Sequence, residues 1–258
     1  MRKDYIWSIT LLISFLFWLT VPSYRLFFSY IIFIHVIVLY CGIRYLSFNF
    51  FLKSLCKKGD AKKQCALTFD DGPDPACTPQ VLDLLDKYNF KATFFLIADR
   101  VLRHRELCTM IAARGHTIAC HDLHHAYTSN FRRSKKMTSE IGQAQSIIAL
   151  ICGLKPRFYR PPVGLSNPHL RTALEKNSMI CIGWSRSAND AGNRLRSSFS
   201  HFVSLPADGA VILLHDVLPV AAYKNEYFSS LEAMLRRLQA ERFDVVTVDK
   251  LFSEKPYL

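Results

Sequence analysis

The sequence lacks the patterns by which cysteine-rich or repetitive chains are recognised. Its eight cysteines are scattered and form no Cys-x-x-Cys pair, and no repeat or low-complexity segment is visible. The absence of a repeat excludes a solenoid or another repeat architecture. Several cysteines lie in apolar runs, where a thiol behaves as a small hydrophobic group. This distribution favours a reducing compartment over a disulfide framework.

Charge is absent from two segments near the N-terminus, Tyr5–Val21 and Leu26–Ile43. Each is just long enough to cross a bilayer as a helix, which takes about 17–25 residues. The short break between them predicts a transmembrane helical hairpin in residues 1–50, with His35 hydrogen-bonded across it. One span plus an interfacial segment is the alternative. A cleaved signal peptide is disfavoured, because the apolar stretch is too long and no small-residue cleavage site follows it.

Acidic residues are scarcer than basic ones, 21 against 33, which gives a formal net charge of +12. Arg2 and Lys3 precede the hairpin, Arg25 alone lies in its turn, and further basic residues between Arg44 and Lys63 follow it. The positive-inside rule therefore places both ends in the cytoplasm. We expect a multi-pass protein of the cell inner membrane with its main domain on the cytoplasmic face.

Two clusters of basic residues stand out, Lys53–Lys63 and Arg132–Lys136. Both suit an anionic membrane surface or a phosphate-bearing lipid, and both are also compatible with an ordinary solvated face. The basic residues form no aromatic-interleaved surface, so nucleic acid is not an expected partner.

After a basic linker at residues 51–64, short β-rich runs alternate with longer helical patterns. This alternation predicts parallel βαβ units in a domain spanning residues 65–258. Seven strands would wind an open sheet or close a small, imperfect barrel, and the pattern alone does not decide between them. A proline at the first helical position signals two of the helices, and Gly115 ends another. The predicted strands are Cys65–Phe69, Thr93–Ile97, Thr117–Cys120, Phe158–Arg160, Met179–Trp184, Ala210–Leu214 and Asp244–Val248, and the predicted helices are Gln80–Tyr88, Ala98–Arg114, Ser139–Ile151, His169–Lys176 and Tyr227–Ala240.

Functional side chains in parallel α/β folds gather at the carboxyl ends of strands. Asp70 and Asp71 leave the first strand together, so one carboxylate is placed to bind a metal and the other to act as a base. His121 and His125 follow the third strand, and on one turn of helix their spacing puts both rings on the same face. Two histidines and one carboxylate form a three-ligand metal site with open positions. Taken singly, the acids also fit an ordinary turn, and the histidines fit an ordinary surface.

Two further strand ends carry candidate residues. Arg160 stands beside a rigid Pro-Pro-x-Gly loop, where it can hold a carboxylate in place, and the backbone N–H of Val163 or Gly164 can face a developing oxyanion. His215 ends the sixth strand, as a general acid would. A rigid surface turn and a structural histidine are the alternatives.

In chain order, the motifs Thr-Phe-Asp-Asp-Gly-Pro, His-x-x-x-His, Arg-Pro-Pro-x-Gly and Leu-Leu-His resemble those of the polysaccharide deacetylases, carbohydrate esterase family 4. The resemblance covers about residues 65–248. It implies an α/β fold with an irregular (β/α)7-type barrel, here preceded by the hairpin. It also implies a metal-dependent hydrolase that removes an acyl group, which we expect to be N-acetyl, from an amino sugar.

The resemblance also implies a role for each candidate residue. Asp70 matches the general base, Arg160 the residue that orients it, and His215 the general acid. Asp71, His121 and His125 match the ligands of a divalent ion, for which we expect Zn²⁺. The substrate and oxyanion residues are Pro162, Val163 and Trp184, with Val163 where the family commonly has tyrosine.

One motif departs from the family pattern, in which an aspartate that follows Trp-Ser-x supports the acid histidine. Ser187 holds that place here, while a second aspartate, Asp190, is retained and Ala191 replaces a closing tryptophan. Either Asp190 supports His215, or the activity is weak or the substrate unusual. Asp122, where the family prefers serine or threonine, is a smaller departure.

The predicted membrane anchor limits the range of substrates that we expect. The hairpin and the cytoplasmic orientation favour a lipid-linked saccharide, whereas a periplasmic domain would favour peptidoglycan. A glycan- or lipid-binding protein that keeps the metal site without catalysis is a second class. A glycosidase is disfavoured. It needs two carboxyls about 5–9.5 Å apart across a sugar, whereas Asp70 and Asp71 are adjacent in the chain and lie beside the expected metal ligands. The expected partners are a saccharide substrate and the membrane.

Overall fold

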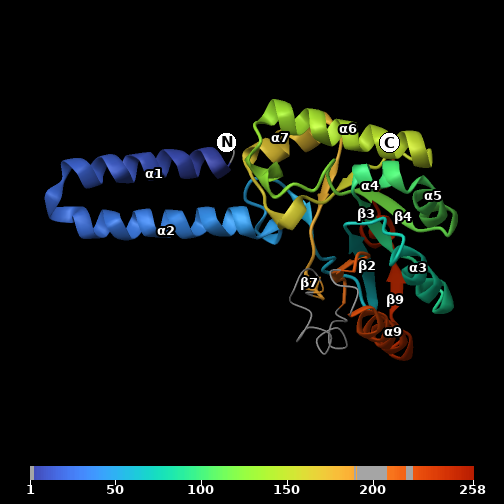
Figure 1. Cartoon of the computed structure of the whole chain (residues 1–258). Coiled ribbons are helices and arrows are strands. Elements are labelled where there is room, and N and C mark those ends of the chain that lie inside the picture. Colours follow the sequence, from blue (N-terminus) through green and yellow to red (C-terminus); the bar gives the residue numbers. More distant parts are fainter. Residues whose placement is uncertain (1–2, 189, 191–207, 219–222) are drawn as a thin grey trace.

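The computed structural model describes residues 3–188, 190, 208–218 and 223–258. Two helices, α1 (Lys3–Thr20) and α2 (Arg25–Arg44), lie side by side and project from an α/β body (Figure 1). Arg2 and Ala191, which entered the predictions above, lie outside the described residues.

The helix pair is apolar on its surface and is joined across its length by polar contacts. Leu26 is 89% exposed, and most of the large apolar side chains exposed in the described structure belong to α1 and α2. His35 Nε2 lies 2.9 Å from Thr10 Oγ1 on the other helix, as expected. By length and composition the segment Pro22–Arg44 is long and apolar enough to cross a membrane, whereas Tyr5–Thr20 is shorter.

The body is built on parallel strands that confirm the seven predicted ones. Their order is β1-β6-β5-β4-β3-β2-β8-β7, with β9 also paired to β2. The two additional strands are short, and β1 comes from the segment predicted as a linker. The strands are β1 (Ser54–Leu55), β2 (Gln64–Asp70), β3 (Thr93–Leu96), β4 (Thr117–Cys120), β5 (Phe158–Tyr159), β6 (Ile180–Ile182), β7 (Arg186–Ser187), β8 (Val211–His215) and β9 (Asp244–Val246).

The sheet curls into an incomplete barrel. Inward-facing side chains from most strands meet in one buried cluster, which includes Phe95, Phe158, Ile182 and Val211. Ile182 on β6 and Val211 on β8 belong to the same cluster although four strands separate them in the sheet, and only a curled sheet brings them together. No ladder joins β1 to β7 within the described residues, so the barrel prediction holds for the curl and the closed ring is not formed.

Helices cover the outer face, where a larger apolar cluster packs between them and the sheet. The helix predicted over Ala98–Arg114 is wrong as a single element: His104 leaves the helical region at φ −131° and divides it into α4 (Ala98–Arg103) and α5 (Arg105–Ala113). The others are α3 (Thr78–Lys87), α6 (Ser134–Cys152), α7 (Pro168–Lys176), α9 (Lys224–Ala240) and α10 (Val248–Phe252).

The cysteines depart from the expectation drawn from their spacing. Cys108 on α5 and Cys152 on α6 form a disulfide, while the other six are free. The pairing depends on how α5 packs against α6, so the spacing of the cysteines in the sequence does not predict it. The scattered distribution, which favoured a reducing compartment over a disulfide framework, therefore did not predict this pair.

The helix pair is fixed to the body next to the loop that follows β5. Ser166 Oγ donates to the carbonyl of Gly42 at 2.6 Å, and the Ser166 N–H donates to the carbonyl of Ile43 at 2.9 Å. Leu46 and Phe51, just beyond α2, are buried in the core of the body. The end of α2 is therefore anchored only a few residues from the Pro162–Gly164 loop.

Candidate active site

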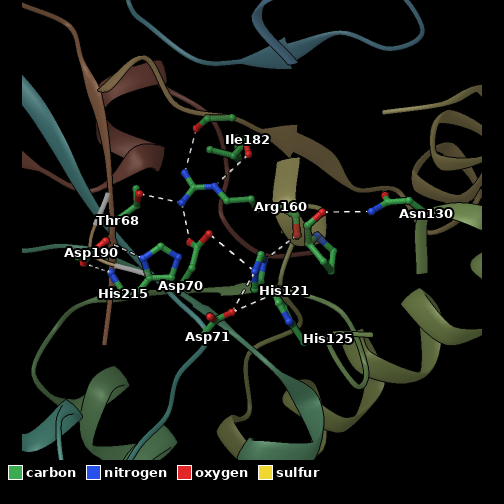
Figure 2. A network of polar contacts seen from close by, with 12 residues as sticks. Thr68, Asp70, Asp71, His121, His125, Asn130, Arg160, Ile182, Asp190 and His215 are labelled. Atoms are coloured by element: carbon green, nitrogen blue, oxygen red, sulfur yellow. Dashed lines mark hydrogen bonds and ion pairs between the residues drawn. The ribbon is translucent and has the colours of Figure 1, made fainter. Parts of the chain in front are cut away.

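The candidate site lies at the carboxyl ends of β2 and β8. Asp70 ends β2 and His215 ends β8, and the parallel register pairs the two residues directly. Asp71 follows in a left-handed conformation, at φ 71°, so the extended strand ends at Asp70. Figure 2 shows the side chains of the neighbouring strand ends converging on these residues.

Asp71, His121 and His125 lie close enough together to share one cation. Asp71 Oδ1 is 3.4 Å from His121 Nε2 and 3.2 Å from His125 Nε2, and one ligand atom from each residue lies within 4.8 Å of the others (Figure 2). This Asp71 oxygen is buried and has no hydrogen-bond partner among the described residues. An orphaned carboxylate oxygen facing two imidazoles fits the ligand set of a divalent ion such as Zn²⁺.

The backbone conformation that brings the two histidines together differs from the predicted one. Residues 121–125 are not helical, because Asp122 and His125 adopt left-handed conformations at φ 93° and φ 54°. His121 Nδ1 donates to the carbonyl of Arg160 at 2.8 Å, which leaves Nε2 facing Asp71. A hydrogen bond of this kind fixes the ring orientation of a metal-binding histidine. The prediction that one turn of helix carries the two histidines is therefore wrong.

The loop that carries the histidines is held by ion pairs around the buried carboxylate of Asp122. Asp122 accepts a hydrogen bond from Ser129 Oγ at 2.6 Å, and the Arg132 guanidinium lies 3.6 Å from the same carboxylate. Arg132 also pairs with Glu140 on α6. Through Arg132, Asp122 therefore links the loop to α6, although the family prefers serine or threonine at this position.

Arg160 is fully buried and holds the Asp70 carboxylate. Its Nη1 donates to Asp70 Oδ1 at 2.6 Å and to Thr68 Oγ1 at 2.8 Å. The remaining guanidinium nitrogens donate to the carbonyls of Ile182 and Gly183. Because every nitrogen is engaged, the fork cannot rotate, and Asp70 keeps its second oxygen free to face the site, 3.8 Å from His121 Nε2.

His215 is paired with Asp190. Its Nδ1 lies 2.8 Å from Asp190 Oδ1, and its backbone N–H donates to Asp190 Oδ2 at 2.8 Å. Burial of His215 favours the neutral ring, but the charge and hydrogen bond of Asp190 outweigh it and raise the pKa to about 9. Asp190 therefore makes the contact that the family pattern assigns to the position of Ser187.

The histidines and the carboxylate of the cluster perturb one another. Burial raises the pKa of Asp71, yet the nearby His121 outweighs it through its charge, so that the pKa lies well below its usual range. Burial lowers the pKa of His121, but the charges of Asp70 and Asp71 outweigh it, so the pKa is raised above its usual value. Burial lowers the pKa of His125. Perturbed groups gathered at strand ends are typical of functional sites.

The loop after Arg160 is strained at the predicted oxyanion position. Val163 has φ 52°, an outlier for a β-branched residue, and such strain is concentrated at functional sites. A side chain on Gly164 would meet the Trp184 ring at 2.2 Å, so the indole lies directly against this loop. Pro162 is buried, and its carbonyl accepts from Asn130 Nδ2 at 3.2 Å.

Two polar residues near the site were not predicted from the sequence to have a role there. Thr68 links Arg160 to the backbone of β8, because its hydroxyl accepts from Arg160 and donates to the carbonyl of Ile212 at 2.8 Å. Asp216 is fully buried, and burial raises its pKa to about 7 although Thr78 Oγ1 donates to it at 2.6 Å. A polar residue inside an apolar strand was the available signal for Thr68, and the position next to His215 was the signal for Asp216.

Comparison with known proteins gives a consistent result. A family model described as polysaccharide deacetylase matches residues 57–181. A Bacillus cereus peptidoglycan-N-acetylglucosamine deacetylase is 34% identical over 197 residues, which cover 75% of this chain and 90% of that protein. The peptidoglycan-N-acetylglucosamine deacetylase PgdA of Listeria monocytogenes is 31% identical over 77% of this chain, and the match spans only 41% of that longer protein.

Solved structures agree with this result. The peptidoglycan deacetylase PdaC from Bacillus subtilis superposes with a TM-score of 0.63 at 30% identity, covering 75% of this chain and 91% of that one. A peptidoglycan N-acetylglucosamine deacetylase solved with a benzamide ligand gives a TM-score of 0.70 at 26% identity, covering 80% and 95%.

Proposed function

Because this chain belongs to the polysaccharide deacetylase family, we propose that it hydrolyses the N-acetyl group of an amino sugar in a lipid-linked saccharide of the cell envelope. The observation that carries the proposal is the convergence of Asp70, held by Arg160, the Asp71–His121–His125 cluster and His215 on one sheet edge. This arrangement supplies a base, a cation site and an acid, which amide hydrolysis needs.

The proposed division of labour follows from the contacts of each side chain. Asp71, His121 and His125 would hold a divalent ion, Zn²⁺ in our proposal, which when bound polarises the acyl carbonyl and lowers the pKa of water. Asp70 takes the proton of the attacking water through its site-facing oxygen, while Arg160 keeps the carboxylate in place. The Val163 backbone N–H would donate to the oxyanion, which is typically worth about 10²–10³ in rate.

His215 completes the reaction by protonating the leaving amine. An amine is a poor leaving group without that proton, so an amide substrate requires an acid that is protonated at neutral pH. The pKa of about 9, set by Asp190 against the cost of burial, meets this requirement. The intact His215–Asp190 pair therefore favours a catalyst over a binding protein that merely retains the cluster.

Membrane attachment is part of the proposal. The exposed apolar surface of α1 and α2 supports insertion of both helices as a hairpin, and the distribution of basic residues supports a cytoplasmic body. The sugar of a lipid carrier would then be presented beside the end of α2, where Ser166 joins the helix to the loop after Pro162–Gly164. Alkaline phosphatase fused to the C-terminus tests the orientation: activity would overturn the cytoplasmic assignment.

A second candidate, a peptidoglycan deacetylase with its body outside the cytoplasm, is favoured by the Cys108–Cys152 disulfide. Such bonds persist mainly in oxidising compartments. The relatives named as peptidoglycan deacetylases support the same candidate.

Mass spectrometry of envelope lipids and glycans, with and without the gene, separates the two candidates. The loss of one acetyl group from a lipid-linked sugar supports the first candidate, and the same loss confined to peptidoglycan supports the second. An Asp70→Asn copy that restores deacetylation in the deletion strain would contradict the proposed base in either case.

A further inference from the structure

A polar cleft of about 550 Å³ opens beside the candidate metal ligands Asp71 and His125. Its lining includes Arg100 and Arg103 of α4, a helix that carries none of the motifs identified in the sequence. A group bound in this cleft would lie next to the reacting acyl amide. The residues of α4 are therefore placed to recognise a substituent of the same substrate.

Apart from the candidate metal ligand Asp71, the carboxylates that line this cleft have cationic partners, whereas Arg103 has no anionic partner within the described part of the chain. Asp99 Oδ2 lies 2.6 Å from His124 Nδ1, and Asp74 Oδ2 lies 3.7 Å from Arg100 Nη1. Arg103 donates from Nε to the backbone carbonyl of Asp99 at 3.1 Å, and within the described part of the chain no ion pair engages its guanidinium. Arg103 is exposed and available to an anion.

The positive character continues past His124. This histidine also lines a neighbouring hollow together with Arg133, Lys135 and Lys136. These three belong to the basic cluster that suited a phosphate-bearing substrate in the sequence. The two hollows share His124 and both contain cations, although Lys136 in the second one is paired with Glu140, and the first hollow reaches the candidate metal ligands.

We propose that the cleft binds an anionic substituent of the amino sugar, a phosphate or a carboxylate, with Arg103 as its main contact and Arg100 as a secondary one. Guanidinium groups pair with such oxyanions through two parallel hydrogen bonds, whereas a neutral sugar offers them only hydroxyl oxygens. The inference rests on the proposed function, because it names the substrate class of the same site.

The test compares three N-acetylated probes on the full-length protein in detergent. N-acetylglucosamine 1-phosphate carries a phosphate, N-acetylmuramic acid carries a carboxylate, and di-N-acetylchitobiose is neutral. Acetate release should give a kcat/KM about tenfold higher for one anionic probe than for the neutral one, a difference of about 1.4 kcal/mol. The preferred anion identifies the source. Equal values for all three probes would overturn the proposal.

Substitution of the arginine assigns the preference to the cleft. Arg103→Gln should reduce the ratio of anionic to neutral kcat/KM to about one, chiefly through KM. Arg105→Gln is the matched control, because Arg105 is exposed on α5 two residues away and does not line the cleft. A preference that survives Arg103→Gln, or that Arg105→Gln abolishes equally, would contradict the assignment.

Calorimetry separates failure of the inference from failure of the proposed function. If none of the probes is hydrolysed, the proposed function is wrong for these sugars, and the titration of N-acetylglucosamine 1-phosphate then decides on the cleft. Binding that Arg103→Gln weakens about tenfold, and Arg105→Gln does not, supports the anion subsite. No binding, or binding unchanged in Arg103→Gln, overturns it.

Discussion

Replacing Asp190 by asparagine tests how the acid is tuned. In the wild-type protein the Asp190 carboxylate contacts both the ring and the backbone N–H of His215 at 2.8 Å. Asparagine keeps the size of the side chain and one acceptor oxygen but removes the charge. The substitution therefore isolates the electrostatic part of the contact, and the packing stays nearly unchanged.

The expected change in pKa is large. The pKa of His215 is raised from 6.5 to about 9, and at about 1.4 kcal/mol for each pKa unit this corresponds to about 3 kcal/mol favouring the protonated ring. Burial acts in the opposite direction, and only the smaller raising effects of Asp70 and Asp71 remain, so in Asp190→Asn the pKa should fall to about 6.5. A raised pKa means that wild-type His215 keeps its proton up to about pH 9 and loses it above.

The pH dependence of kcat/KM measures this directly. The wild-type alkaline limb should fall with a midpoint near 9, and in Asp190→Asn it should move below neutrality. At pH 8 the variant should accordingly be slower by more than about tenfold, with a smaller deficit at pH 6. Asp83→Asn is the control, because Asp83 is an exposed carboxylate paired with Arg114 on the outer surface. An alkaline limb that does not move in Asp190→Asn would refute the reasoning.

Three further predictions concern the base, the ligand loop and the oxyanion loop. Asp70→Asn should lower kcat by about 10²–10⁴ in acetate-release assays while zinc binding persists, because Asp70 is the proposed base and is not one of the three candidate ligands. Arg132→Ala should lower the free energy of unfolding by about 3 kcal/mol in urea titrations, since it leaves the buried carboxylate of Asp122 without its cation. Gly164→Ala should reduce both stability and activity, because φ is +68° and the new Cβ would meet Trp184 at 2.2 Å.

Each of these predictions has a result that would contradict it. For the base, it is an Asp70→Asn protein with near wild-type turnover. For the ligand loop, it is an Arg132→Ala protein as stable as Arg133→Ala, in which an exposed neighbouring arginine is removed. For the oxyanion loop, it is a Gly164→Ala protein that matches Gly153→Ala, where φ is also positive but no atom stands near the added Cβ.

The sequence predicted the elements better than their arrangement. Period and composition located the seven main strands, because each is an apolar run bounded by turn residues. The break at His104 and the two short strands were missed, since short elements are decided by tertiary contacts. The sequence also could not predict that the barrel stays open, because closure depends on how far the sheet curls.

The candidate site was predicted from motif order, and its geometry was not. Asp71, His121 and His125 were identified correctly as neighbours, but an irregular loop with left-handed residues replaces the assumed helical turn. The sequence left open whether Asp190 supports His215, and the structure shows the contact. The Cys108–Cys152 disulfide and the α4 cleft depend on packing between distant segments, which linear spacing does not encode.

Anomalous diffraction at the zinc edge, on crystals of the full-length protein grown with zinc, tests the central claim most directly. We expect one ion bound by Asp71, His121 and His125 at about 2.0–2.2 Å from each ligand atom, beside the free oxygen of Asp70. The absence of an ion among these three side chains, or zinc held only by other residues, would contradict the account.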